Sequence, residues 1–465
     1  MAKKKAPSGA QPLVVIILAA GAGKRMKSAL PKVLQPLAGR PLLQYVLDTA
    51  RTLNPAAIHV VYGHGGESVP KAFTHERVSW VRQVEQLGTG HAVMQVAPLL
   101  SADQRALILY GDGPLITTAT LEALLAAAGR DEVAVLTVNA SDPSGYGRVV
   151  RDAAGRVRAI VEEKDASAKQ RRLRECNTGV VTVPVSRLTK WLGKLDNRNA
   201  QREYYLTDLI ALAVRDRVAV RPLIAADEAE VQGVNDRVQL AQAEGAWRTR
   251  QTRRLMLDGA TLIDPTRVDV RGQVTVGADV VIDVNVVFEG SVSLGDGVRI
   301  GANCLIRNAQ IAAGTEVFSH CIIDHAAIGA DCRIGPFARI RPESVLARQV
   351  HIGNFVEVKK SRIGVGSKAN HLSYLGDATI GAKVNVGAGT ITCNYDGANK
   401  WPTTIEDDVF IGSGSMLVAP VHIGAGANIG AGSTISRSAP AAQLTIARAR
   451  PVTIPGWKRP TKRGT

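Results

Sequence analysis

A six-residue period dominates the second half of the chain. Apolar residues recur at a strict spacing of six, in Val276, Ile282, Phe288, Leu294, Ile300 and Ile306. A second apolar or small register lies four residues after each of the first five, in Val280, Val286, Val292, Val298 and Cys304. The pattern slips by one residue at Ile311 and then recurs as far as Ile435. A period that is held over so long a stretch constrains the fold before any local motif does.

A period of six fits neither the helical period of 3.6 nor the plain strand period of 2. It suits a short strand followed by a tight turn, in which the aliphatic residue points inward. Three such units close one triangular coil, and stacked coils bury their apolar residues on one another. The pattern therefore predicts an all-β parallel β-helix in a domain that covers residues 259–465 and ends in a C-terminal tail. The pattern does not determine the handedness of the β-helix. It is also compatible with a rigid scaffold that has no catalytic function.

Length, charge and cysteine use set further limits. A chain of 465 residues is expected to form two or three domains, and no apolar run approaches the roughly 20 residues of a membrane span. Its five cysteines are scattered, which predicts reduced thiols in a cytoplasmic protein. The apolar run Leu13–Ala20 is short and has no cleavage-site pattern after it, so we expect no signal peptide. The net charge of +16 lies partly in two tails, Lys3–Lys5 and Lys458–Arg463. No nucleic-acid motif accompanies it, so we expect anionic small-molecule substrates and neither nucleic acid nor membrane as partner.

A glycine-rich loop follows the first apolar run, Leu13–Leu18. Such a run is typical of a strand buried in a parallel sheet, and bare N–H groups between a strand and a helix bind phosphate. The Walker pattern fails because Leu18 stands at its first glycine and Arg25 follows the lysine. The dinucleotide pattern fails because Met26 stands at its third glycine. We predict an α/β, Rossmann-like domain with a mostly parallel sheet and a phosphate-binding turn.

Two later segments fit this domain. Gln83–His91 reads as a small-residue loop that opens a helix, and Leu107–Asp112 reads as a buried strand that ends in a carboxylate. The carboxyl end of a strand is where open α/β sheets bind ligands, and carboxylate oxygen suits Mg²⁺. Asp236–Leu257 has a helix-forming composition. The predicted division is a disordered basic tail at 1–12, an α/β domain at 13–237, a linker helix at 238–258 and the β-helix at 259–465.

The string Leu18-x-x-Gly21-x-Gly23-x-Arg25-Met26, with Pro31-Lys32, resembles the nucleotide-sugar pyrophosphorylase signature. With the hexapeptide period, the chain resembles the bifunctional N-acetylglucosamine-1-phosphate uridyltransferase/glucosamine-1-phosphate N-acetyltransferase family over nearly its whole length. This resemblance implies a left-handed β-helix and a homotrimer. It also implies acetyl transfer from acetyl-CoA to glucosamine 1-phosphate, then uridylyl transfer from UTP with release of pyrophosphate. The implied product, UDP-N-acetylglucosamine, is a precursor of bacterial cell-wall and outer-membrane glycans.

The same resemblance assigns site residues to the first domain. Two are implied as Mg²⁺ ligands, Asp112 and Asn235. The implied UTP- and product-binding residues are Leu18, Ala19, Ala20, Gly21, Arg25, Lys32, Gln83, Gly88, Thr89, Tyr110, Gly111, Asp112, Gly147, Glu162, Asn177 and Asn235. Ala22 departs from the family, which often has a polar residue there.

In the second domain we expect the repeat to be interrupted at 341–376 and at 392–401, where polar residues gather. The resemblance implies that His371 is the catalytic base, a role that suits imidazole near neutral pH. It implies that four residues bind the sugar substrate, namely Arg341, Lys359, Tyr374 and Asn385. It implies that six bind acetyl-CoA, namely Ala388, Asn394, Tyr395, Ser413, Ala431 and Arg448. Asn370 stands where we expect glycine.

Two alternatives remain at this point. The chain could be a single-function sugar-1-phosphate nucleotidyltransferase whose β-helix only supports oligomerisation or regulation. It could also be a basic, non-enzymatic protein that binds nucleic acid, which would require a steep salt dependence and no turnover of UTP.

Overall fold

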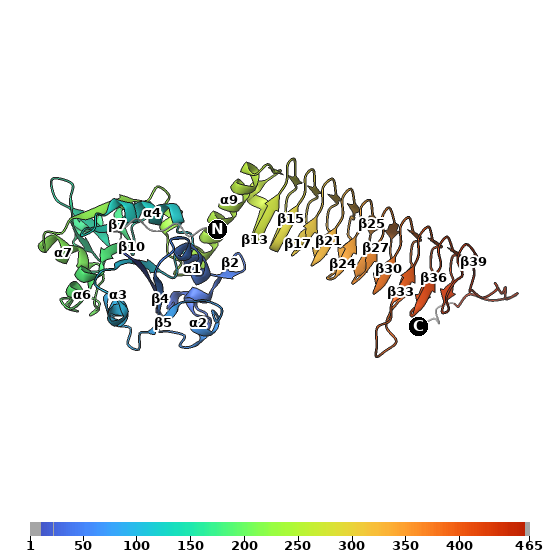
Figure 1. Cartoon of the computed structure of the whole chain (residues 1–465), viewed down its shortest axis with the longest axis horizontal. Helices are drawn as coiled ribbons and strands as arrows, with labels where there is room; N and C mark the ends of the chain where they lie inside the picture. The colour runs from blue at the N-terminus through green and yellow to red at the C-terminus, as the bar shows by residue number, and fades with distance from the viewer. Residues whose placement is uncertain (1–10, 22, 461–465) are drawn as a thin grey trace. The chain divides into compact units, whose positions relative to one another are not determined.

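The computed structural model describes residues 11–21 and 23–460, and the chain divides into two compact units at Trp247 and Arg248 (Figure 1). Of the predicted tail at 1–12, only Gln11 and Pro12 lie within the described residues. Ala22 and the end of the basic stretch Lys458–Arg463 lie outside them. The predicted domain boundaries stay a prediction, because the division by contacts falls inside one long helix.

The N-terminal unit is built on a twisted, mostly parallel sheet, as predicted. Within the described residues, its strands run in the order β11-β7-β10-β6-β1-β4-β5, and a β8–β9 hairpin is attached through β10. Among the described strands of the main sheet, β10 alone runs antiparallel to both of its neighbours. The strands of this sheet are β1 (Leu13–Ala19), β4 (Ala57–Tyr62), β5 (Ser79–Arg82), β6 (Arg105–Tyr110), β7 (Val133–Asn139), β8 (Arg148–Arg151), β9 (Val157–Val161), β10 (Glu175–Pro184) and β11 (Val220–Ile224).

Helices cover both faces of this sheet. Alternate residues of β1 belong to different apolar clusters, because successive side chains of a strand point to opposite faces. Val14 and Ile16 pack in one cluster, and Val15 and Ile17 pack in the other. The helices of this unit are α1 (Leu42–Thr52), α2 (Ser68–Lys71), α3 (Thr89–Val96), α4 (Thr118–Ala127), α5 (Ala168–Arg171), α6 (Val185–Leu192), α7 (Asp208–Arg215) and α8 (Glu228–Val231). A two-stranded ribbon is formed by β2 (Pro36–Leu37) and β3 (Arg40–Pro41).

The predicted linker helix is α9 (Arg237–Leu257). Its first half packs Ala243 and Trp247 against Tyr45 of the N-terminal unit. In its second half, Arg248 pairs with Asp269, and Leu255 joins the core of the C-terminal unit. No helix in the described part of the chain combines the length and the apolarity that a membrane span requires.

The C-terminal unit is the predicted parallel β-helix. Within the described residues, one face is an eleven-stranded sheet, and a seventeen-stranded sheet folds around a corner to form the other two. The first sheet contains β12 (Thr261–Leu262), β14 (Val281–Ile282), β16 (Arg299–Ile300), β19 (Glu316–Val317), β22 (Arg333–Ile334), β25 (His351–Asn354), β28 (Lys368–His371), β31 (Asn385–Val386), β34 (Phe410–Ile411), β37 (Asn428–Ile429) and β39 (Leu444–Thr445).

Successive strands of the second sheet lie alternately on its two faces. On one face β17 pairs with β20, and on the other face β18 pairs with β21. It contains β13 (Val268–Val276), β15 (Val286–Leu294), β17 (Leu305–Arg307), β18 (Gln310–Ile311), β20 (Ile322–Asp324), β21 (Ala326–Ile328), β23 (Arg339–Ile340), β24 (Ser344–Leu346), β26 (Glu357–Lys359), β27 (Arg362–Ile363), β29 (Tyr374–Gly376), β30 (Ala378–Ile380), β32 (Ile391–Cys393), β33 (Thr403–Ile405), β35 (Met416–Val418), β36 (Val421–Ile423) and β38 (Thr434–Ile435).

The six-residue register becomes a stack of aliphatic side chains inside this β-helix. Ile300, Val317 and Ile334 occupy equivalent places on successive coils, and all three are buried. Equivalent residues lie 18 apart where three full repeats close a coil, as for Asn285 and Asn303. They lie 17 apart across the slip near Ile311, as for Asn308 and His325, and 18 apart again between Ala326 and Ser344. One residue is therefore lost in a turn without shifting the strands that follow.

One of the two expected interruptions is wrong. Between 341 and 376 the coils continue without a gap, because Ile340 pairs with Val358 and Ile352 pairs with Ala369. The charged residues of this stretch occupy outward and turn positions, which impose no apolar requirement on the repeat. The second interruption is present as a loop between β32 and β33, where the Asp396 carboxylate accepts hydrogen bonds from Ala398, Asn399 and Trp401.

Candidate functional site

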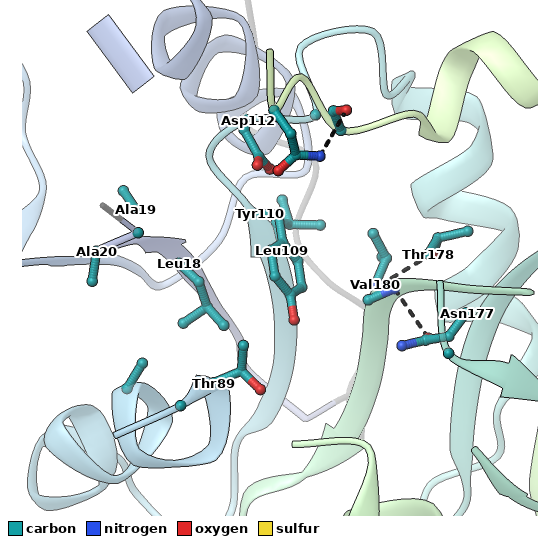
Figure 2. Close-up of a pocket in the computed structure, with 18 of the residues that line it drawn as sticks. Leu18, Ala19, Ala20, Thr89, Leu109, Tyr110, Asp112, Asn177, Thr178 and Val180 are labelled. Carbon is teal, nitrogen blue, oxygen red and sulfur yellow. Dashed lines mark hydrogen bonds between the residues drawn. The ribbon is translucent and has the colours of Figure 1, made fainter. Parts of the chain in front are cut away.

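A cavity of about 670 Å³ opens beyond the carboxyl ends of β1 and β6 in the N-terminal unit (Figure 2). Most of the predicted residues line it, namely Leu18, Ala19, Ala20, Gly21, Lys32, Gln83, Gly88, Thr89, Tyr110, Asp112, Gly147, Glu162, Asn177 and Asn235. Arg25 and Gly111 are not among the described residues that line it. Arg25 is exposed in the short helix η1 (Lys24–Met26), and the N–H of Gly111 donates to Leu18 O at 2.9 Å.

The glycine-rich loop closes one end of the cavity. Gly23 has a left-handed φ of 58°, and a Cβ atom there would lie 2.7 Å from Cβ of Lys32. This close approach brings the loop against Lys32 and places Lys24 on the cavity wall. Residue type alone does not distinguish Lys24 from Arg25, because the turn of η1 determines which of the two lines the cavity.

Lys32, Asp112 and Asn235 meet at this end of the cavity. The Nζ atom of Lys32 makes an ion pair with Asp112 and donates to Oδ1 of Asn235 at 3.1 Å. Two oxygens from distant segments thus converge on one positive group that is largely shielded from solvent. This donor set fits a small hard cation, which prefers carboxylate and amide oxygen. Within the described residues, no cluster of three or more His, Cys, Asp or Glu side chains adds further ligands.

The loop at Gln83–Thr89 forms a second wall. The Gln83 amide donates to Gly88 O at 3.1 Å, and the amide and the His91 ring lie 3.0 Å apart. Gly88 has a φ of 105°, and a Cβ atom there would lie 2.7 Å from Tyr204 O. Only glycine fits this close backbone contact. The loop therefore presents amide and backbone groups of the kind that read the edge of a pyrimidine base.

A third wall carries Glu162 and Asn177. Burial raises the pKa of Glu162, whose carboxylate accepts a hydrogen bond from Thr207 Oγ1 at 3.0 Å. Thr207 stands at the N-cap position of α7, but its hydroxyl donates to Glu162 and makes no hydrogen bond to the backbone of the helix. The Asn177 N–H donates to Gly147 O at 2.9 Å, and its side-chain oxygen accepts from Gly179 N at 3.0 Å. Polar groups on this wall suit the hydroxyl groups of a sugar.

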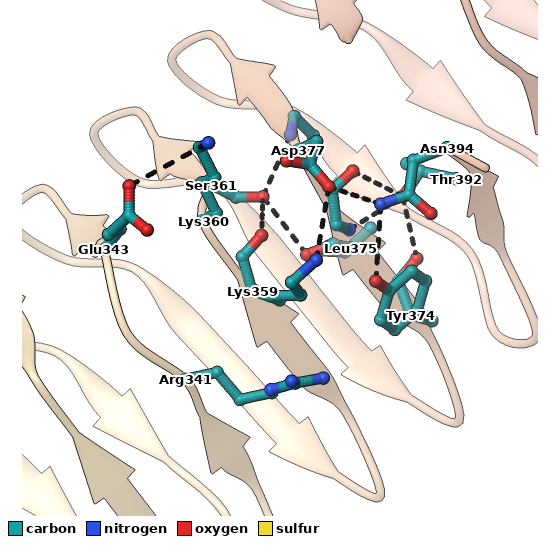
Figure 3. A network of polar contacts seen from close by, with 12 residues as sticks. Arg341, Glu343, Lys359, Lys360, Ser361, Tyr374, Leu375, Asp377, Thr392 and Asn394 are labelled. Atoms are coloured by element: carbon teal, nitrogen blue, oxygen red, sulfur yellow. Dashed lines mark hydrogen bonds and ion pairs between the residues drawn. The ribbon is translucent and has the colours of Figure 1, made fainter. Parts of the chain in front are cut away.

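On the β-helix, a polar network joins residues of neighbouring coils (Figure 3). Lys359 lies 3.5 Å from the carboxylate of Asp377, which also accepts a hydrogen bond from Asn394. The Asn394 amide lies 3.4 Å from Tyr374 Oη. A hydrogen bond with the Lys400 amine and the nearby Asp377 carboxylate raise the pKa of Lys359. Arg341 lies one coil from Lys359 and pairs with Glu357 at 2.7 Å.

His371 and Tyr374 belong to different sheets, because the turn Leu372–Ser373 separates β28 from β29. The His371 ring is exposed, and its Nδ1 atom lies 3.1 Å from Oδ1 of Asn354 on the preceding coil. Asn385 occupies the same sheet as His371 and pairs with Lys368. The structure thus places His371 at an accessible corner of the β-helix, where the side-chain amide of Asn354 contacts its ring.

The residues expected at acetyl-CoA form a row along one edge. Ala388, Ser413 and Ala431 lie on three successive coils, since Gly414 N donates to Ala388 O at 2.7 Å and Gly432 N donates to Ser413 O at 2.8 Å. Arg448 donates to Ala431 O at 2.6 Å. Tyr395 is exposed on the loop after β32, and its hydroxyl donates to Gly397 O at 2.6 Å. A long, flexible ligand could follow this row.

Comparison with known proteins covers both units. A MobA-like NTP transferase domain matches residues 15–179, a GMPPB C-terminal domain matches 270–373, and the bacterial transferase hexapeptide, six repeats, matches 402–437. The hexapeptide match is consistent with a left-handed coil.

Full-length relatives carry the name bifunctional protein GlmU. The relative from Aromatoleum aromaticum is 59% identical over 97% of this chain and 99% of its own length. The relative from Azoarcus sp. is 58% identical over 96% of this chain and 99% of its own length. The relative from Ralstonia pickettii is 56% identical over 96% of this chain and 98% of its own length. The similarity is therefore not confined to either unit.

Proposed function

The chain belongs to the family of bifunctional GlmU proteins, and on this premise we propose that it makes UDP-N-acetylglucosamine by two successive transfers. It is an enzyme with a nucleotidyltransferase domain and a hexapeptide acyltransferase domain. The β-helix acts as a glucosamine-1-phosphate N-acetyltransferase, and the α/β unit acts as a UDP-N-acetylglucosamine diphosphorylase. One observation carries the proposal. The cavity residues of the α/β unit and the polar network of the β-helix occur in a single chain, and its relatives match that chain over nearly its whole length.

In the acetyl transfer, the amine of glucosamine 1-phosphate must lose a proton before it becomes a nucleophile. The exposed ring of His371 serves as the general base that accepts this proton. The amine then attacks the thioester carbonyl of acetyl-CoA, and collapse of the tetrahedral intermediate expels the CoA thiolate, which takes up a proton. Arg341 and Lys359 bind the sugar phosphate, with Tyr374 and Asn385 beside them.

Acetyl-CoA follows the row of Ala388, Ser413 and Ala431. Small side chains on this row leave the backbone open to a ligand, and Arg448 supplies positive charge near one end of it. Asn394 and Tyr395 border the row from the loop after β32. This assignment takes its support from the register of the three coils.

In the uridylyl transfer, a phosphate oxygen of N-acetylglucosamine 1-phosphate attacks the α-phosphorus of UTP and pyrophosphate leaves. Catalysis of this kind rests on positioning and charge neutralisation. Lys32, with Arg25 near it in sequence, offsets charge on the triphosphate, and the glycine-rich loop offers backbone N–H groups. Gln83, Gly88 and Thr89 bind the uridine, while Gly147, Glu162 and Asn177 bind the sugar. Asp112 and Asn235 would hold Mg²⁺, which would neutralise further phosphate charge.

We also propose that the protein is a cytoplasmic homotrimer. The described cysteines form no disulfides, which suits a reducing compartment. Phe337, Phe355 and Leu372 make an exposed apolar stripe along one corner of the β-helix, and the two phenyl rings stack at 5.4 Å. Such a stripe suits contact with a second copy of the chain. Sedimentation of the wild type and of Phe355→Asp tests this, and a monomeric wild type contradicts it.

A single coupled assay tests the whole function. Glucosamine 1-phosphate, acetyl-CoA, UTP and Mg²⁺ are incubated with the purified protein, and the products are followed by mass spectrometry. We expect CoA, pyrophosphate and UDP-N-acetylglucosamine. Formation of a nucleotide sugar without any acetylation would favour a single-function nucleotidyltransferase.

A further inference from the structure

A buried guanidinium lies directly behind one wall of the cavity. Arg148 begins β8 immediately after Gly147, and only 2% of its side chain is exposed. Gly145, Tyr146 and Gly147 line the cavity, whereas Arg148 is not among the described residues that line it. A charged side chain this well buried needs partners that compensate for its lost hydration.

Those partners belong to the loop itself and to the segment after β9. Arg148 Nη1 donates to Tyr146 O, its Nη2 lies 3.3 Å from Oε1 of Glu163, and its Nε donates to Arg171 O at 3.4 Å. The second oxygen of Glu163 accepts from Gly145 N at 2.7 Å. Arg148 and Glu163 therefore hold the loop Gly145–Gly147 at two backbone groups. Arg148 binds the carbonyl oxygen of Tyr146, and Glu163 binds the N–H of Gly145.

The loop in turn lies against the proposed sugar-binding groups. A Cβ atom at Gly147 would lie 3.5 Å from Oε2 of Glu162, so the backbone approaches that carboxylate closely. Gly147 O accepts from Asn177 N at 2.9 Å. Glu162 and Glu163 are adjacent in sequence, with one facing the cavity and the other holding the loop from behind. The loop is therefore in direct contact with Asn177 and lies against the Glu162 carboxylate.

We propose that Arg148 and Glu163 are positioning residues for the hexosamine-phosphate half of the uridyltransferase cavity. They touch no substrate, and they fix the backbone at Gly145–Gly147 so that Glu162 and Asn177 keep their places. This inference rests on the proposed function. Displacement of a binding group by about 1 Å can lower a rate by about 10²-fold, so a buried support of this kind has kinetic consequences.

A merely structural ion pair would have different consequences, and the same hairpin offers a matched control. Arg151, three residues along β8, makes two bonds with the Glu175 carboxylate at 2.7 and 2.6 Å. Neither Arg151 nor Glu175 is among the described residues that line the cavity. Loss of the Arg151 charge tests stability alone, while loss of the Arg148 charge tests stability and loop position together.

The experiment compares full-length Arg148→Gln, Arg148→Lys, Glu163→Gln and Arg151→Gln with the wild type. The KM values for N-acetylglucosamine 1-phosphate and for UTP are measured separately, with melting temperature and acetyl transfer as internal checks. We expect Arg148→Gln to raise the KM for the sugar phosphate by about tenfold or more, with the KM for UTP within about twofold. Arg148→Lys should recover part of this loss, and Arg151→Gln should leave both KM values unchanged.

Equal changes in both KM values, or the same change in Arg151→Gln, would overturn the inference. If Arg148→Gln does not fold, Glu163→Gln decides the matter, because it removes only the charge that holds Gly145; an unchanged sugar-phosphate KM in that variant also overturns the inference. A wild type that makes no nucleotide sugar from UTP refutes the proposed function itself, which is a distinguishable result.

Discussion

The Nζ atom of Lys32 lies 3.1 Å from Oδ1 of Asn235 and also pairs with Asp112. The ammonium group therefore occupies the place on which the two proposed metal-binding oxygens converge. We expect Lys32→Met to bind a divalent cation more tightly in the absence of nucleotide, by roughly tenfold, because a competing positive charge is removed. Uridylyl transfer should fall in the same variant, because the triphosphate loses a counter-charge. Titration with Mn²⁺ followed by electron paramagnetic resonance measures the affinity.

The control for this experiment is Lys71→Met, which removes an exposed lysine from α2. It should leave Mn²⁺ affinity unchanged. An unchanged affinity in Lys32→Met as well would show that the cation binds elsewhere.

Substitution of His371 separates the two activities. We expect His371→Ala to lower acetyl transfer by about 10²–10⁴-fold, the usual contribution of a general base, while uridylyl transfer persists. The two rates are measured in separate assays, by release of CoA and by release of pyrophosphate. His422→Ala removes another exposed imidazole of the β-helix, paired with Glu406, and should affect neither rate. Equal acetyl transfer in all three proteins would contradict the assignment of His371 as the general base, whereas a wild type without acetyl transfer would support the single-function alternative.

The buried carboxyl group of Glu162 predicts a stability change that depends on pH. Burial raises its pKa, so the native state binds a proton more readily than the unfolded state. The resulting stabilisation is present below the ordinary pKa of Glu and is lost as the pH rises through the raised value. Glu162→Gln stays neutral, so its melting temperature should exceed that of the wild type at pH 7 and approach it near pH 4.

Uridylyl transfer should nevertheless fall in Glu162→Gln, because the side chain is proposed to bind the sugar. Melting is followed by calorimetry, and Glu122→Gln, an exposed change in α4, is the control. A melting temperature that is lower than the wild-type value at pH 7 would contradict the prediction.

The stack of aliphatic residues in the β-helix predicts a large cost for truncation. Ile334 is fully buried between Val317 and Ile352 on neighbouring coils. We expect Ile334→Ala to lower the free energy of unfolding by about 2–5 kcal/mol. Arg333→Ala changes the neighbouring outward side chain, which is 57% exposed, and should cost under about 1 kcal/mol. Urea denaturation followed by circular dichroism measures both, and similar midpoints would refute the proposed role of the stack.

The sequence predicted the β-helix well because each buried position repeats. The spacing of Ile300, Val317 and Ile334 reports the coil directly, without knowledge of any distant contact. The interruption expected at 341–376 is absent, because Arg341 and Lys359 lie on consecutive coils that pair without a gap. Outward positions accept almost any residue, so polarity there carries no information about coil continuity.

The cavity was predictable only in part. Its individual loops follow from strand–turn–helix patterns, yet the meeting of Lys32, Asp112 and Asn235 joins residues that are 80 and 203 positions apart. Among the sequence observations, only the family resemblance places these three residues in one site. The roles of Thr207 and Asp377 were missed for a related reason. Each depends on how one loop lies against another, and no local spacing encodes that.

The regular step of the coils has a consequence for ligand length. Neighbouring strands lie about 4.8 Å apart, so the edge from Ala388 through Ser413 to Ala431 advances by about 10 Å over two steps. An extended molecule along this edge meets backbone groups at that fixed interval. On the proposed assignment of this row to acetyl-CoA, the number of coils beyond His371, more than the identity of any single side chain, sets the length of the ligand that the edge can accommodate.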